Sequence, residues 1–457
     1  MNKGLTKDLT TGNVFRTLLS FSMPYFLSYF LQTLYGMADL YIVGQFNAVE
    51  STTAVSIGSQ IMHMITVMIV GLAMGTTVSI GHETGAKNEK QVLVTIGNTV
   101  TLFLSLSVTA AVVLTLCIRS IVAAMSTPAE AVSSTISYLT VCFIGIPFIT
   151  AYNIISSVFR GMGDSKSPMY FIAVACVSNI VLDYIFIGRL GMGAAGAALG
   201  TTLAQAVSVA VALFRIRTDS GMRHIRLASG DLKPKRAVMG KLLSIGVPVA
   251  LQDGFIQISF LLITVIANKR GLFDAAAVGV VEKIIGILFL VPSSLLSSVS
   301  ALAAQNIGAG KKERAKQTLK YAMITAVVFG TVSALFMQFN AEPVVGIFRS
   351  EPEVVRLGGQ YLRGYVWDCV FAGVHFCFSG YFCACGKSGI SFLHNAIAIV
   401  CARIPLAYLA SKLFAQTLFP MGLATVTGSA VSVVICVIAY LWLAGRERRS
   451  KAVTGSV

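Results

Sequence analysis

Charged residues are scarce in this sequence. Only 12% of its 457 residues are charged, whereas 55% are hydrophobic, and soluble domains are nearer one quarter charged. The mean hydropathy is +0.79. Apolar blocks such as 61–80, 92–118 and 426–444 are long enough to cross a hydrocarbon core of ~30 Å as helices. Membrane strands would alternate apolar and polar residues instead. The composition therefore predicts an α-helical membrane protein.

Catalytic and metal-binding motifs are also missing. The chain has five histidines and neither an H-E-x-x-H nor a G-x-S-x-G motif. The stretch "GMGAAG" (Gly191–Gly196) matches a dinucleotide fingerprint in letters, but its flanks are membrane spans rather than a βαβ unit. The nine cysteines are scattered, mostly within apolar segments, and we expect free thiols. The sequence thus predicts no enzyme activity and no cofactor.

What the chain does contain is a series of apolar helical segments. The first follows a short polar N-terminus without a small-residue cleavage site, so we expect a retained helix. The pattern predicts twelve transmembrane helices, and the fold class is all-α. The expected spans are 14–43, 52–80, 92–116, 132–159, 168–188, 194–216, 239–267, 275–304, 318–338, 356–384, 390–413 and 420–445.

Basic residues alternate along the chain in a way that predicts its orientation. Lys and Arg number 35 against 19 acidic residues, giving a net charge of +16. Most of them fall on one side if the N-terminus is inside, which puts both termini in the cytoplasm. This alternation also argues against a nucleic-acid partner. The main inside-facing groups are the N-terminal segment, Arg160 with Lys166, Arg215–Lys241, Lys311–Lys320 and Arg446–Lys451.

The two halves of the chain match each other at an offset of about 223 residues. "LLSFSMP" (Leu18–Pro24) corresponds to "LLSIGVP" (Leu242–Pro248), and "HETGAKNEK" (His82–Lys90) to "QNIGAGKKE" (Gln305–Glu313). Six spans per half keep both repeats in the same orientation. We expect an N-terminal lobe (1–216), a basic cytoplasmic linker (217–238) and a C-terminal lobe (239–457). Two pseudo-symmetric six-helix lobes around a central cavity fit a transporter that works as a monomer.

Acids within the apolar spans are the strongest functional signal. "LYGMADLYIVG" (Leu34–Gly44) places Asp39 inside an apolar run, where an acid costs ~2.5–3.5 kcal/mol. Tyr35 shares its helix face, as Asn179 does with Asp183 four residues away. With oxygen donors from other spans they would form a pocket for a cation or proton. The predicted coupling residues are Tyr35, Asp39, Asn153, Asn179, Asp183, Thr201 and Thr202.

The sequence leaves alternatives open at this pocket. Na⁺ at Asp39, Asn179 and Asp183 and a proton shared between the two acids are both compatible with the residues. Asp39 and Asp183 can also be read as interfacial residues that reach the headgroups. The asparagines and threonines can be read as ordinary hydrogen bonders between helices.

The second half carries buried charges of its own, and none repeats Asp39 or Asp183. They are Asp253, Glu282, Lys283, Asp368 and Arg403, with Glu282–Arg403 and Asp368–Arg403 as candidate ion pairs. Aromatic residues recur in the same spans and can stack on flat cations. The predicted substrate cavity comprises Gln252, Asp253, Phe255, Trp367 and Asp368.

The chain as a whole resembles the multidrug and toxic compound extrusion (MATE) family, bacterial branch. The resemblance is carried by "LYGMADLYIVGQF", "GHETGAKNEK", "RGMGDSKSP", "NIVLDYIFI…GMGAAGAALGT" and "AAQNIGAG". It departs from the family at Gly36, where Asn is usual, and at His82, where Gln is usual. It implies Na⁺- or H⁺-driven export of organic cations or drugs across a bacterial cytoplasmic membrane, with the coupling residues in the first lobe.

Two other functions remain as alternatives to this antiporter. A flippase for a lipid-linked precursor needs a positively charged cavity, whereas the first half shows the opposite sign. A channel usually repeats its filter by oligomer symmetry, whereas here the symmetry lies within one chain.

Overall fold

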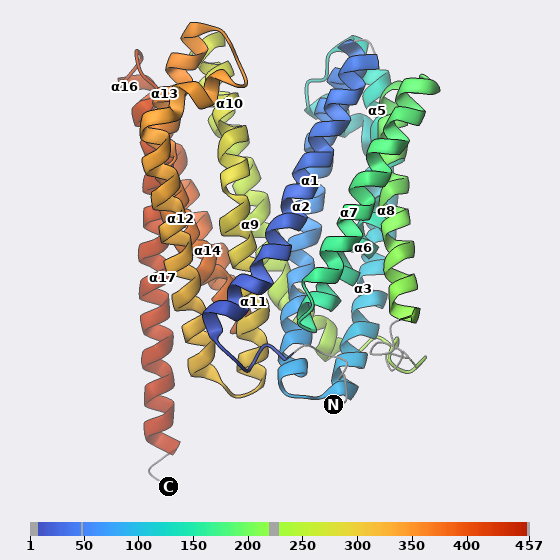
Figure 1. Ribbon diagram of the computed structural model, residues 1–457, viewed down its shortest axis with the longest axis vertical. Coiled ribbons are helices and arrows are strands. Elements are labelled where there is room, and N and C mark those ends of the chain that lie inside the picture. The colour runs from blue at the N-terminus through green and yellow to red at the C-terminus, as the bar shows by residue number, and fades with distance from the viewer. Residues whose placement is uncertain (1–7, 47–48, 219–227, 455–457) are drawn as a thin grey trace. The chain divides into compact units, whose positions relative to one another are not determined.

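Within the described residues, the first half of the chain consists of helices joined by short loops. The computed structural model describes residues 8–46, 49–218 and 228–454 (Figure 1). Gly145 separates two helices that bend by 45° at that point, and a π-helical turn follows Asp183 directly. The elements are α1 (Val14–Phe46), α2 (Val49–Gly85), α3 (Glu89–Leu116), α4 (Ile118–Ala124), α5 (Ala129–Ile144), α6 (Ile146–Gly161), α7 (Lys166–Asp183), η1 (Tyr184–Arg189) and α8 (Gly193–Thr218).

The second half shows the same kinds of break. Two of its helices bend by 42° around residues 366–367, and a second π-helical turn ends at Arg403. Such π turns often occur at functional residues. The elements are α9 (Arg236–Asn268), α10 (Leu272–Leu288), α11 (Leu290–Gly308), α12 (Lys312–Gly346), α13 (Pro352–Tyr365), α14 (Asp368–Ala384), α15 (Ser388–Ala398), η2 (Ile399–Arg403), α16 (Ile404–Leu413) and α17 (Phe419–Thr454).

The helices account for the predicted spans. Within the described residues, nine segments are long and apolar enough to cross a membrane, and the bent pairs α5–α6 and α13–α14 raise this to eleven. The twelfth predicted span is α1, whose 33 residues are long enough but include several Tyr and Ser residues as well as Asp39. The prediction of an all-α membrane protein is confirmed.

The chain forms two compact units, each with its own apolar core. The first contains Met1–Ala250 and Ala304–Arg314, and the second contains Leu251–Ala303 and Ala315–Val457. α9 and α11 therefore contribute residues to both. Large buried side chains such as Tyr152 and Phe159 fill the first unit, and Tyr361 and Tyr365 fill the second. The predicted lobe boundaries at 216 and 239 remain a prediction.

In the first unit, α2 and the end of α11 meet at two glycines. A Cβ on Gly85 would lie 1.9 Å from the Gln305 carbonyl oxygen, and one on Gly308 would lie 2.0 Å from that of His82. Only glycine permits this approach of backbone to backbone. The Gln305 side chain secures the same region, because its amide donates to the Gly161 carbonyl (2.9 Å) and accepts from the Leu9 amide (3.2 Å).

The described part of the basic linker is attached to α3. The Asn98 side chain donates to the Asp231 carbonyl (3.2 Å) and accepts from the Lys235 amide (2.6 Å). Thr101 donates to the Leu232 carbonyl at 2.8 Å. A side chain at Gly97 would collide with the Asp231 carbonyl. Residues 231–235 of the predicted basic cytoplasmic linker are thus hydrogen-bonded to a helix. Residues 219–227 of this linker lie outside the described residues.

A loop of the second unit is held by one arginine. Arg270 follows α9, is only 8% exposed, and pairs with Asp274 at 2.9 Å. Its guanidinium also donates at 2.8–3.3 Å to four backbone carbonyls in the last turn of α16 and the loop that leads to α17, those of Ser411, Phe414, Ala415 and Thr417. These donations satisfy carbonyls that no helix supplies with a partner.

Replacing this arginine tests the role of the loop contacts. We expect Arg270→Ala to destabilise the folded protein by about 2–4 kcal/mol, because it leaves Asp274 and the carbonyls without charged donors. Arg270→Lys should recover only part of this loss, since an ammonium lacks the planar fork. Thermal unfolding in detergent, followed with a thiol-reactive dye, provides the measurement. The exposed Arg349→Ala serves as the control, and an unchanged melting temperature for Arg270→Ala would contradict the expectation.

Candidate functional site

The two acids of the first half lie together in the interior of the first unit. Asp39 comes from α1 and is 6% exposed, and Asp183 ends α7 with no exposed surface. The two carboxyl groups are near enough for each to influence the charge of the other. Among the residues that the structure describes, no basic side chain influences the charge of either acid. Two ionised carboxylates in this environment repel each other, so either a cation lies between them or one of them binds a proton.

Side chains from α7 and α8 link the two acids. The Thr201 hydroxyl donates to Asp39 Oδ2 at 3.2 Å, and the Asn179 amide donates to Asp183 Oδ2 and to Thr201 Oγ1 at 3.5 Å each. The Thr201 hydroxyl also lies 3.1 Å from the Ala197 carbonyl and can donate to only one of the two. The network therefore joins α1, α7 and α8 through hydrogen bonds between side chains.

Several oxygen atoms of this network have no hydrogen-bond partner. They are Oδ1 of Asp39, Oδ1 of Asn179 and Oδ1 of Asp183, all buried. Buried acceptors without donors are costly, and carboxylate and amide oxygens are ligands for hard cations. A monovalent cation or a proton placed among them would supply the missing positive charge.

A glycine on α8 makes room for Asp183. A Cβ at Gly200 would lie 2.2 Å from Asp183 Oδ1. The carboxyl group therefore lies directly against the helix backbone. Sequence analysis missed this role because the glycine stands in the small-residue run "GAALG", which predicts only close helix packing.

The remaining predicted coupling residues lie around the network without a direct link to it. Tyr35 lies near Gln205 of α8 and near Asp39, without a hydrogen bond to either. Asn153 donates to the Ile149 carbonyl of its own helix at 2.8 Å. Thr202 packs against Gly145 at the α5–α6 bend. Gln205 was also missed, although it lies one turn beyond Thr201.

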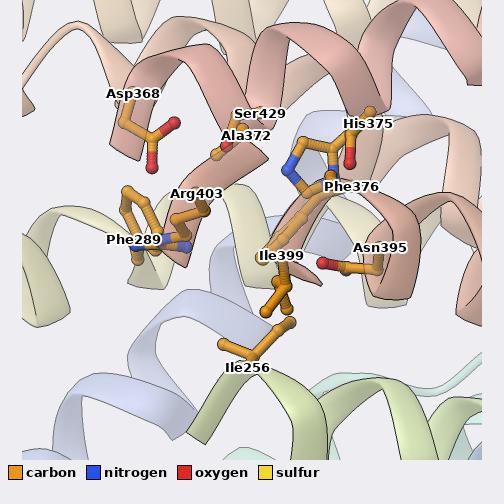
Figure 2. A pocket seen from close by; sticks show the side chains of 13 residues that line it. Ile256, Phe289, Asp368, Ala372, His375, Phe376, Asn395, Ile399, Arg403 and Ser429 are labelled. Carbon is orange, nitrogen blue, oxygen red and sulfur yellow. The ribbon is translucent and has the colours of Figure 1, made fainter. Parts of the chain in front are cut away.

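The second unit contains a separate small cavity (Figure 2). Its volume of about 20 Å³ is enough for a buried water. In Figure 2, Asp368 and Arg403 lie on one side and His375 and Asn395 on the other. Of the predicted substrate residues, Asp368 lines this cavity. Gln252, Asp253, Phe255 and Trp367 do not, and the Phe255 ring instead packs edge-on against Phe392 at 5.4 Å.

The candidate ion pairs of the second half do not form. Neither Glu282 nor Asp368 approaches Arg403 within 4.0 Å, although both are its electrostatic neighbours. Arg403 instead donates to the Tyr365 hydroxyl at 2.5 Å and lies over the Phe260 ring at 5.1 Å. Lys283 lines a second cavity together with Arg349.

Comparison with known families decides what kind of protein this architecture belongs to. The MatE family model matches the chain twice, over residues 24–185 and 248–409. The chain belongs to the MatE family. It is a multi-pass membrane transporter of the MATE multidrug efflux family and not an enzyme. The repeated match agrees with the internal repeat found in the sequence.

Relatives and solved structures cover nearly the whole MatE chain. The probable multidrug resistance protein YpnP of Bacillus subtilis (strain 168) is 29% identical, over 91% of this chain and 93% of that protein. An FAD transporter of Shewanella oneidensis is 24% identical, over 88% and 89%. The outward-facing structure of a multidrug resistance MATE family transporter matches with a TM-score of 0.88 at 24% identity, over 98% of both chains. This last match shows the shared fold.

A substitution on α8 tests whether Asp183 depends on the missing side chain. In Gly200→Ala the new Cβ must displace the Asp183 carboxyl, which we expect to cost about 1–3 kcal/mol of stability and to weaken efflux of this MatE transporter. Thermal unfolding and dye efflux from cells provide the measurements. Gly36→Ala on α1 is the matched control, because nothing lies within 4 Å of its added Cβ. Equal behaviour of the two variants would contradict the packing argument.

Proposed function

We propose that this MATE transporter is a cation-coupled antiporter that exports organic cations or drugs by alternating access, with Asp39 and Asp183 as the coupling site. The observation that carries the proposal is a pair of buried acids on separate helices, linked by Thr201 and Asn179, with no basic partner. In this proposal the coupling ion is Na⁺ or H⁺, and the transporter works as a monomer.

The chemistry of the pocket supports coupling to conformation. α1, α7 and α8 each contribute one or more ligands, so a cation bound among them favours one arrangement of the three helices. When the cation leaves, the carboxyl groups repel each other and that arrangement loses its stabilisation. A ligand that prefers one conformation shifts the equilibrium toward it, which is the requirement for coupled transport.

The substrate class rests on the relatives and on the sign of charge in the first unit. YpnP is named as a probable multidrug resistance protein, and the Shewanella relative as an FAD transporter. We extend the multidrug assignment to this chain because the first unit's acids attract cations. A flippase for a lipid-linked precursor is a second candidate. The acid pair disfavours it, since an anionic pyrophosphate head would be repelled.

The proposed orientation has both termini in the cytoplasm of a bacterial cell. The basic residues of the linker and of the 311–320 segment support it, because such residues are retained on the cytoplasmic side. With this orientation, the end of α3 lies outside and the loop between α14 and α15 lies inside.

Neutralising one acid tests the coupling site. We expect Asp39→Asn to reduce gradient-driven dye efflux by about 10-fold or more, because the amide cannot bind a proton and is a weaker cation ligand. Everted membrane vesicles, with either an imposed Na⁺ gradient or an imposed pH gradient, provide the assay and identify the coupling ion. The exposed Glu50→Gln on α2 is the control. Undiminished, gradient-dependent efflux by Asp39→Asn would remove the proposed mechanism.

Native cysteines test the orientation. Cys117, which follows α3, is exposed, and Cys385, which follows α14, is half-buried. In a Cys401→Ser background we expect a membrane-impermeant maleimide to label Cys117 in intact cells and Cys385 only after permeabilisation. Cys117→Ser should abolish the first signal. Labelling of intact cells that survives this substitution and is lost with Cys385→Ser would invert the topology.

A further inference from the structure

Arg403 is a buried cation with one buried acid, Asp368, and one half-buried acid, Glu282, among its charged neighbours, yet it pairs with neither. Its side chain is 7% exposed at the end of the π turn η2. The guanidinium donates to Tyr365 and stacks near Phe260, and its Nε has no hydrogen-bond partner. Asp368 and Glu282 both influence it electrostatically from beyond 4.0 Å. An unpaired buried charge is strongly unfavourable, so Arg403 depends on the field of both acids.

The two acids show the complementary situation. Both oxygens of Asp368 are buried without a hydrogen-bond partner, and so is Oε1 of Glu282. The other Glu282 oxygen accepts from the Thr264 hydroxyl at 3.2 Å. Arg403 is the basic group among the electrostatic neighbours of each acid. The acids therefore depend on Arg403 as their source of positive charge.

The cavity beside Arg403 is polar and small. Four polar residues line it, and each has at least one polar atom without a hydrogen-bond partner. These atoms are Oδ1 and Oδ2 of Asp368, Nδ1 of His375, Nδ2 of Asn395 and Nε of Arg403. A volume of about 20 Å³ accommodates water and excludes a drug-sized ligand. Because donors and acceptors both face it, bridging water satisfies this set better than an ion of either sign.

The polar centres of the two units differ in one charge. In the described part of the first unit, Asp39 and Asp183 have no basic neighbour. In the second, Asp368 and Glu282 share Arg403. When all of these acids are ionised, the acid pair of the first unit lacks the positive charge that Arg403 supplies in the second. One monovalent cation bound between Asp39 and Asp183 would then give the two centres the same net charge. The guanidinium is thus the electrostatic equivalent of a bound cation.

We propose that Arg403 is a built-in counter-ion that occupies the cation position of the second unit, so that only the first unit exchanges a cation during transport. The comparison rests on the proposed coupling function of Asp39 and Asp183. Removing the guanidinium should therefore create a second monovalent-cation site at Asp368, which lines the same cavity as Arg403. Arg403 is then the residue that restricts coupling to one site per chain.

Equilibrium binding of ²²Na⁺ to purified protein at alkaline pH tests this inference. Asp39→Asn removes the first site and serves as the background. We expect no Na⁺ on the Asp39→Asn protein and one Na⁺ per chain on Asp39→Asn/Arg403→Met, in which Met approximates the length of the Arg stem without its charge. Adding Asp368→Asn should abolish the gained site.

Arg403→Lys in the same background is the matched control, because it keeps a cation at the position and should bind no Na⁺. Failure of the Met variant to gain Na⁺ would overturn the proposal. Two further results would also overturn the proposal: binding of Na⁺ to the Asp39→Asn protein, or to its Arg403→Lys variant, that is lost when Asp368→Asn is added. Both of these chains keep a cation at position 403, so they test the proposal even if the Met variant does not fold. Efflux by Asp39→Asn alone decides the coupling function of the first site, so the two failures are distinguishable.

Discussion

Two carboxyl groups buried side by side without a basic partner are the constraint on which the first unit depends. The interior of a helical bundle offers no bulk water to screen them, so their mutual repulsion must be offset by a proton or a cation. The local structure serves this requirement. Gly200 leaves space for the Asp183 carboxyl, a π turn begins immediately after it, and Thr201 holds Asp39 by a hydrogen bond.

The architecture could be predicted from the sequence because the bilayer fixes the length of its elements. A span of about 20 apolar residues has few alternatives to a helix, and the predicted spans agree with the observed helices to within several residues. The proximity of Asp39, Asn179, Asp183 and Thr201 could also be anticipated. Acids inside apolar runs have few acceptable environments, and spacings of four residues put polar groups on one helix face.

Features that depend on contacts between distant residues could not be predicted. Arg160, read as an inside-facing topology charge, is buried with its guanidinium 4.2 Å from the centre of the Tyr25 ring. Arg403 lies near two acids yet makes its close contact with Tyr365. In both cases the aromatic partner comes from another helix, and no local pattern identifies it. Gly200 belongs to the same class, because its importance is the absence of a side chain facing Asp183.

The attachment of the linker to α3 has a mechanical consequence. Lys235, whose amide is held by Asn98, directly precedes α9, so this helix is pinned at its first residue. The helix has 33 residues and is therefore ~50 Å long. Three hydrogen bonds between residues 98–101 and 231–235 thus fix the start of a helix long enough to span the membrane against α3.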